Sequence, residues 1–255
     1  MNTTSDSPTP APQSKQLYRR LGLVLLGFIV VYFCLAYILA PFLWEQYAAR
    51  HPAWENVPRI THTGDKHPGD PLNVAIIGTE YELKKTLLAA GWYPADPLTL
   101  KSSLEIAEAS VLDRKYDEAP VSSLFLFDRK QDLAFEQPVG DNPRKRHHVR
   151  FWKYNEQTPD GRDVWFGSAT YDERVGLSHT TGEITHHIDG NVDAERDHIM
   201  DTLKKTELLI EVRIVAGFHT ILEGKNGGGD AWHTDGSLSV AVTKLMTPTT
   251  PAKSN

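Results

Sequence analysis

Residues 73–91 read NVAIIGTEYELKKTLLAAG, and this stretch decides the expected fold. It begins with a short apolar run that ends in glycine, which is typical of a buried strand. Thr79 and Glu82 then have the spacing of a capping box, in which the two residues cap each other's backbone at a helix start. The helix is expected over 80–90 and ends at Gly91. A strand that leads directly into a helix therefore opens the folded domain.

The rest of the domain is predicted to contain more strands than helices. Two further helices are expected, over 100–113 and over 192–205, where apolar residues recur at helical spacing. Runs rich in apolar and β-branched residues predict strands at 122–129, 132–138, 147–154, 163–171, 209–217 and 237–245. Because short turns join most of these strands, we expect an α+β fold with a mixed, largely antiparallel sheet and helices on one face.

An apolar run without charged residues over 21–43 predicts one N-terminal transmembrane helix. At about 1.5 Å per residue, this run crosses a hydrocarbon core of about 30 Å. It is longer than the apolar region of about 7 to 15 residues in a cleavable signal peptide. Lys15, Arg19 and Arg20 precede it, so the positive-inside rule places the N-terminus in the cytoplasm. In a Gram-negative bacterium the helix would cross the inner membrane and the domain would be periplasmic.

Composition divides the remainder of the chain. Residues 1–20 are expected to be a disordered cytoplasmic tail, since small polar residues and prolines cannot bury enough apolar surface. Residues 44–71 contain four prolines and are expected to form a linker. The domain is then expected over 72–246, and a second disordered tail over 247–255.

Charge and cysteine content exclude two classes of protein. The net charge of -6 and a pI near 6.0 argue against a general nucleic-acid binder. Cys34 is the only cysteine and lies in the apolar run, so no disulfide can stabilise the outer domain.

Histidines are concentrated in the second half of the chain, where eight of the eleven fall between His147 and His233. In the strand RHHVRFWK (146–153), the period of two places His148 and Arg150 on the same face. That face either lines a site or is the solvated face of a half-exposed sheet.

The helix expected over 192–205 carries two charges on its apolar side. Val192, Ile199 and Leu203 define the apolar stripe, and Arg196 occupies the position that completes it, with Glu195 beside it. The two charges either form an internal salt bridge or face a pocket, because long charged side chains are seldom buried without partners.

His186, His187 and Asp189 lie just before this helix, where backbone N–H groups and the helix dipole favour an anion. With Arg150 and Arg196 as charge partners and a histidine as general acid or base, these residues could hold a phosphoester. The alternative is that Asp189 or Asn191 only caps the helix and that the histidines fix the loop by hydrogen bonds.

A divalent metal is a competing interpretation. His148 and His186 or His187, with a carboxylate from Asp172, Asp189 or Asp193, would supply the imidazole and oxygen donors that suit zinc or another divalent ion. The chain has no HExxH motif and no paired Cys-x-x-Cys motif, so the spacing does not require a metal.

Long segments of the domain resemble the LssY C-terminal domain family of bacterial envelope proteins. These segments are LNVAIIGTEYELKKTLLAAGWYPADPLTLKSSLEIA, FLFDRKQDLAFEQPVGDNPRKRHHVRFWK, VWFGSATYD and THHIDGNVDAERD, and together they cover nearly all of residues 72–218. Members of that family occur joined to or near membrane phosphatase-type domains. The resemblance therefore implies, by association, a role in envelope lipid or phosphate metabolism, and it implies no particular reaction.

Two classes of function follow. The first is an envelope hydrolase or phosphotransferase that acts on a phosphate-bearing lipid or saccharide, and the second is a non-catalytic ligand-binding or adaptor domain. The candidate catalytic and ligand-binding residues are His148, His186, His187, Arg150, Arg196, Glu195 and Asp189. A catalytic set should converge on one cavity, whereas structural residues should be dispersed or held in internal pairs.

Overall fold

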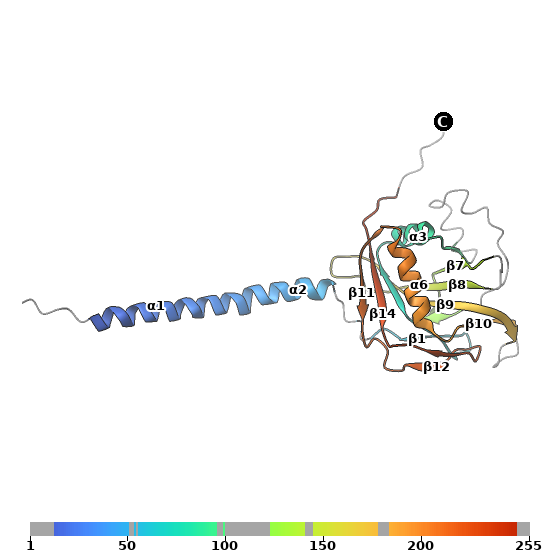
Figure 1. Ribbon diagram of the computed structural model, residues 1–255, viewed down its shortest axis with the longest axis horizontal. Helices are drawn as coiled ribbons and strands as arrows, with labels where there is room; N and C mark the ends of the chain where they lie inside the picture. The colour runs from blue at the N-terminus through green and yellow to red at the C-terminus, as the bar shows by residue number, and fades with distance from the viewer. Residues whose placement is uncertain are drawn as a thin grey trace, which may run out of the picture. The chain divides into compact units, whose positions relative to one another are not determined.

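The computed structural model describes residues 13–50, 54, 56–95, 99, 123–140, 145–177 and 184–248 (Figure 1). The chain divides into two compact units, Met1–Ala53 and Trp54–Asn255. The helix expected over 100–113 and most of the tail expected over 247–255 lie outside the described residues.

The first unit is helical throughout its described part. It consists of α1 (Gln13–Cys34), the π-helical turn η1 (Leu35–Leu39) and α2 (Ala40–Arg50). Residues Leu17–Glu45 are long and apolar enough to cross a membrane, and the span predicted over 21–43 lies within them. Residues 13–20 belong to α1, so this part of the predicted disordered tail is helical.

The second unit is built on an eight-stranded sheet with the order β11-β14-β3-β9-β8-β7-β4, in which β10 also pairs with β9. Its strands are β3 (Val74–Ile77), β4 (Tyr93–Pro94), β7 (Leu133–Pro138), β8 (Arg146–Lys153), β9 (Val164–Leu177), β10 (Ile184–Ile188), β11 (Leu209–Val215) and β14 (Leu238–Thr243). The β14–β3 pair is parallel, and the other pairs are antiparallel. The predicted mixed, largely antiparallel sheet is confirmed.

Two helices pack on one face of this sheet, α3 (Glu80–Ala89) and α6 (Val192–Lys204) (Figure 1). The predicted capping box opens α3, because the Thr79 side chain accepts the N–H of Glu82 and the Glu82 carboxylate accepts the N–H of Thr79. The core under the helices includes Val149 and Phe151 of β8. The α+β class with helices on one face is confirmed as predicted.

Two smaller sheets complete the domain. One has the order β2-β1-β5-β6, and the other is the β12–β13 hairpin. Their strands are β1 (Ile60–His62), β2 (Pro68–Pro71), β5 (Phe125–Leu126), β6 (Arg129–Lys130), β12 (Glu223–Lys225) and β13 (Ala231–His233). A second apolar core includes Leu126 of β5 and Trp152 of β8, so the first small sheet packs against the face that is turned away from the helices.

The segment predicted as a linker over 44–71 is largely folded. It contributes β1 and β2, and Trp54 and Val57 are buried in the second core. Pro68 and Pro71 occupy the two ends of β2, where the missing N–H of proline interferes least with pairing. The folded unit therefore begins at Trp54 rather than at Leu72.

Asn73 joins three elements at the centre of the domain. Its side-chain amide donates to the carbonyl groups of Ala169 on β9 (2.8 Å) and Val192 on α6 (2.9 Å). Its side-chain oxygen accepts the N–H of Ala169 at 2.8 Å. These bonds fix α6 relative to the sheet, and with it the start of the helix that was expected to border the site.

Candidate functional site

A cluster of charged and polar side chains lies on the sheet face that is turned away from α3 and α6. Because side chains alternate along β8, Arg146, His148 and Arg150 share this face while Val149 and Phe151 pack under the helices. The solvated-face alternative is wrong, since all three side chains are buried and His148 has 0% of its surface exposed. We call the set Arg146, His148, Arg150, Thr170, Asp172, His186, His187, Asp70, Glu136 and Asp230 the buried polar cluster.

Arg146 is the most highly connected member of the buried polar cluster. It donates from Nε to Asp172 at 3.1 Å and from Nη1 to Glu136 at 2.7 Å. Its Nη2 lies 3.2 Å from Nε2 of His186, and Nδ1 of His186 lies 3.4 Å from the Asp172 carboxylate. Strands β7, β8, β9 and β10 are therefore joined on one face by a single guanidinium and its partners.

Arg150 and Asp70 form a second buried pair, with Nη1 of Arg150 3.6 Å from the Asp70 carboxylate. Burial raises the pKa of Asp70, and the positive charge of Arg150 opposes that rise. The Asp70 carboxylate also accepts a hydrogen bond from the Asn226 amide at 3.1 Å, so β2 and the β12–β13 hairpin meet at this carboxylate.

His148 lies between the two arginines of β8 and has no hydrogen-bond partner on either ring nitrogen within the described part of the chain. Thr170, its register partner on β9, is buried with an equally unpaired hydroxyl. Burial lowers the pKa of His148 well below 6.5, and the charges of Arg150 and Arg146 lower it further. The ring is therefore neutral at physiological pH.

An unpaired polar group in a protein interior is costly, so His148 requires an explanation. Structural histidines normally donate and accept within the fold, as His187 does through Nδ1, 2.6 Å from the Asp230 carboxylate on the hairpin. The two ring nitrogens of His148 supply one donor and one acceptor, and no described group forms a hydrogen bond with either.

Three of the predicted site residues lie elsewhere. Arg196 is surrounded by carboxylates, with Asp193 at 3.1 Å, Asp197 at 2.8 Å and Asp235 at 2.8 Å. Burial alone would lower the pKa of Arg196, but hydrogen bonds to Asp197 and Asp235 raise it. Asp189 accepts the N–H of Asn191 at 2.8 Å. Asn191, rather than Asp189, is the N-cap of α6.

Glu195 faces the helix side of the sheet, where it contacts a different histidine. Its carboxylate lies 2.7 Å from Nδ1 of His147, and burial raises its pKa. The ring of His147 stacks on that of His198 with 3.7 Å between centroids. Glu195 and Arg196 are both buried as the apolar stripe predicted, but internal partners hold them and neither joins the buried polar cluster.

The described residues do not support the metal interpretation. No group of three or more His, Cys, Asp or Glu side chains in that part of the chain is arranged to hold an ion. The candidates His148, His186 and Asp172 do share one cluster, but Arg146 already donates to Asp172 at 3.1 Å and lies 3.2 Å from Nε2 of His186.

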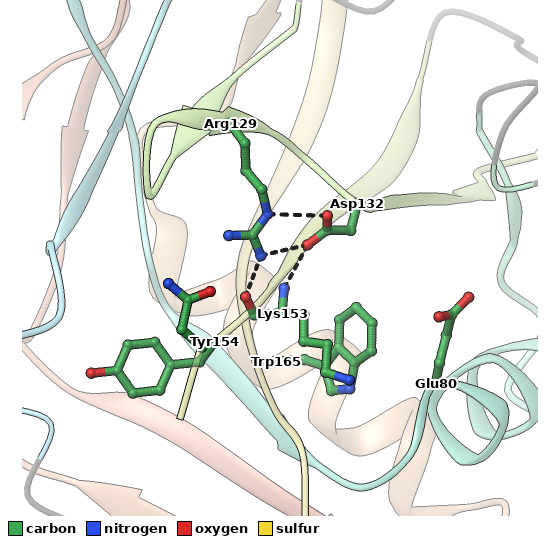
Figure 2. Close-up of a pocket in the computed structure, with 7 residues that line it drawn as sticks. Glu80, Arg129, Asp132, Lys153, Tyr154 and Trp165 are labelled. Atoms are coloured by element: carbon green, nitrogen blue, oxygen red, sulfur yellow. Dashed lines mark hydrogen bonds and ion pairs between the residues drawn. The ribbon is translucent and has the colours of Figure 1, made fainter. Parts of the chain in front are cut away.

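A separate surface pocket of about 390 Å³ lies near the end of β8. Figure 2 shows its lining, with Arg129 directed at Asp132 and Glu80 standing apart on α3. Arg129 contacts Asp132 through two nitrogens, at 3.2 and 2.8 Å, and Asp132 also accepts the N–H of Lys153. These charges are held by one another, so the pocket makes a weaker candidate than the buried polar cluster.

Sequence reasoning missed several members of the cluster. Arg146 was within reach, because it lies two residues before His148 on the same strand face. Asp70 and Asp230 lie in segments without periodicity, and only the tertiary fold brings them to β8.

The comparison with protein families decides the identity of the domain. Residues 54–238, more than half of the chain, match the family model described as LssY C-terminus. The chain belongs to the LssY C-terminus family. The match to the LssY C-terminal domain begins at Trp54, the first residue of the second unit, and includes every member of the buried polar cluster. None of the curated proteins and none of the solved structures matches the chain. The chain is thus a membrane-anchored LssY C-terminal domain.

Proposed function

We propose that the LssY C-terminal domain binds a phosphate-bearing lipid or saccharide of the cell envelope in its buried polar cluster. The observation that carries this proposal is the unpaired ring of His148 between Arg146 and Arg150. The Thr170 hydroxyl adds a further unpaired donor at the same place. Imidazole, hydroxyl and guanidinium donors together suit a ligand rich in acceptor oxygens.

Charge balance explains how such a cluster stays folded without its ligand. The carboxylates of Asp172, Glu136 and Asp70 neutralise the two arginines in the closed form. A bound phosphate would replace part of this carboxylate contact. Asp70 is suited to give way, since its raised pKa lowers the cost of its protonation.

Access requires that the β12–β13 hairpin move, because every described β8 member of the cluster is buried. Two contacts tie the hairpin to the cluster, His187 to Asp230 and Asn226 to Asp70. Asp230 also accepts the N–H of Ile188 at 3.4 Å. The hairpin is held further by the N–H of His233, which donates to Gly190 at 2.8 Å, and by the buried side chain of Trp232. Opening the hairpin would break these few polar contacts and expose Trp232, while the large sheet stays paired.

The site also supports a second candidate, a hydrolase or phosphotransferase on the same ligands. His148 is neutral and retains an unshared electron pair, so it could serve as general base or as nucleophile. His186, whose pKa is likewise lowered by burial, could be the second proton carrier. The internal pairing of Arg146 with Asp172 and Glu136 favours binding without turnover.

The compartment is part of the same proposal. The basic residues Lys15, Arg19 and Arg20 before the span support a cytoplasmic N-terminus and a periplasmic domain at the bacterial inner membrane.

One experiment separates these functions. Full-length protein in nanodiscs is titrated with inorganic phosphate while its thermal unfolding is followed, and p-nitrophenyl phosphate is supplied to test turnover. We expect phosphate to stabilise the wild type by about 2.7 kcal/mol at a hundredfold excess over Kd. His148→Leu should lose this effect, and His67→Leu, at an exposed position, should retain it.

The outcomes differ for each class. Stabilisation without turnover supports a binding domain, and turnover that His148→Leu abolishes supports the enzyme. A phosphate site in the buried polar cluster is refuted if added phosphate does not stabilise the folded wild type and p-nitrophenyl phosphate is not hydrolysed.

A further inference from the structure

Three exposed aliphatic side chains lie at one end of β11 and in the loop that follows it. Ile214 has 56% of its surface exposed, Ile221 59% and Leu222 49%. Single exposed aliphatic residues are normal on protein surfaces. Ile221 and Leu222 are neighbours in the loop, Ile214 lies seven residues earlier on the edge strand β11, and Ile210, nearer the start of β11, is also 61% exposed. Apolar side chains that gather on a surface mark interaction sites.

The loop that carries Ile221 and Leu222 is fixed against the start of the domain. Phe218 is buried, and the Arg59 guanidinium lies 3.9 Å from the centroid of its ring. The same guanidinium donates to the carbonyl oxygens of Trp54 (2.7 Å) and Val57 (2.8 Å). Arg59 thus holds the loop beside the residues at which the chain enters the domain.

A second contact fixes the other side of this loop. His219 lies with Nε2 2.6 Å from the carbonyl oxygen of Leu72, and its N–H donates to Gly236 at 2.9 Å. The N–H of Thr234 donates to the carbonyl of Leu222 at 2.8 Å. The loop that carries Ile221 and Leu222 is therefore held in place on both sides by hydrogen bonds.

The chain between the membrane span and the domain is short. The span ends at Glu45, the helix continues to Arg50, and Trp54 is already buried in the domain core. Five helical residues add about 8 Å and the four chain links from Arg50 to Trp54 add at most about 14 Å. The chain therefore allows at most about 22 Å between Glu45 and Trp54.

We propose that Ile214, Ile221 and Leu222 form a membrane-docking edge, which inserts into the interface of the bilayer that holds the helix. These side chains flank the one part of the domain that the tether keeps at the membrane. The tether also makes insertion an intramolecular event, so a small apolar surface is sufficient. A protein partner would need roughly 800 Å² on each side, more than three side chains provide. Docking would fix which face of the domain meets the lipid. This inference does not depend on the ligand proposed for the buried polar cluster.

Site-directed fluorescence tests the membrane-docking edge in the full chain. Cys34 is the only cysteine, so a Cys34→Ser background accepts single labels. Ile221→Cys and Leu222→Cys carry an environment-sensitive fluorophore in phosphatidylcholine nanodiscs that contain lipids spin-labelled near the head group. Asp201→Cys is the matched control, exposed on α6 near the opposite end of β11. Leu26→Cys, within the span, reports insertion of the helix.

We expect labels at 221 and 222 to be quenched at least threefold more than the label at 201. Quenching at 26 together with equal, weak quenching at 221, 222 and 201 would overturn the proposal. So would quenching at 221 that depends on a second labelled copy and not on spin-labelled lipid, because a protein would then cover the edge. If the label at 26 is not quenched, the helix does not insert in the bilayer, and this result also overturns the proposal.

Discussion

Replacing His148 by leucine should stabilise the domain while it removes the proposed ligand site. The ring is fully buried and neither nitrogen is paired within the described residues. An unsatisfied buried polar group costs about 1 to 3 kcal/mol, and an apolar side chain of similar volume removes that cost. The ion pairs of Arg146 and Arg150 do not involve His148 and should remain intact.

The same substitution should flatten the dependence of stability on pH. The pKa of His148 is lowered well below 6.5 in the folded state, so below pH 6.5 the unfolded chain binds a proton that the native state does not. Stability is therefore fully present above the unfolded pKa and falls with decreasing pH. The loss from this one group should grow as the pH falls further below 6.5, and the leucine variant should not show it.

Thermal unfolding of the full chain in detergent, followed by near-ultraviolet circular dichroism, measures both effects. We expect His148→Leu to raise Tm by roughly 2 to 12 °C at neutral pH, with a larger advantage at pH 5. A variant with lower Tm than wild type and an unchanged pH dependence would refute the reasoning, since His148 would then make a stabilising contact.

Three further predictions concern stability and protonation. Asn73→Ala removes three buried hydrogen bonds and should lower the free energy of unfolding by about 3 kcal/mol in urea denaturation, while Asn155→Ala at an exposed position should change it by less than about 0.5 kcal/mol. Gly167→Ala places a methyl group 2.7 Å from the ring of Phe151 and should lower Tm by several degrees; an unchanged Tm contradicts the packing. His198 should stay neutral until the pH approaches about 4, because burial and the neighbouring histidine lower its pKa, and an NMR titration midpoint near 6.5 would disprove this.

Elements with strong local signals were predictable from the sequence. The run over 73–79 and the Thr79–Glu82 capping box gave both β3 and α3, and the apolar stripe gave α6. The elements that were missed are short or rich in proline and histidine, and they are β1, β2, β4, β10, β12 and β13. Such strands have two to five residues each, which is too short for a period of two to stand out from the flanking turns.

The candidate site was predictable only where one strand defines it. Alternation along β8 placed His148 and Arg150 on one face, and the structure retains that arrangement. Whether this face is exposed to water depends on the sheet β2-β1-β5-β6 and on the β12–β13 hairpin. The sequence of β8 alone does not show that these elements cover it. Glu195 and Arg196 are one residue apart on α6, so the helix turns them toward different partners and neither reaches β8.

The parallel pairing of β14 with β3 constrains when the domain can fold. Residues 239–242 insert between β3 and β11, so this part of the large sheet is closed by a strand that follows β3 by about 165 residues in the chain. Until residues 239–242 have been synthesised, one edge of Val74–Ile77 lacks its native neighbour. The helix α3, which directly follows β3, has by then been complete for a long time. Such late, distant pairing slows folding and exposes an apolar edge to aggregation. A chain that stops before residue 238 would therefore lack the strand that joins β3 to β11, rather than merely a frayed end.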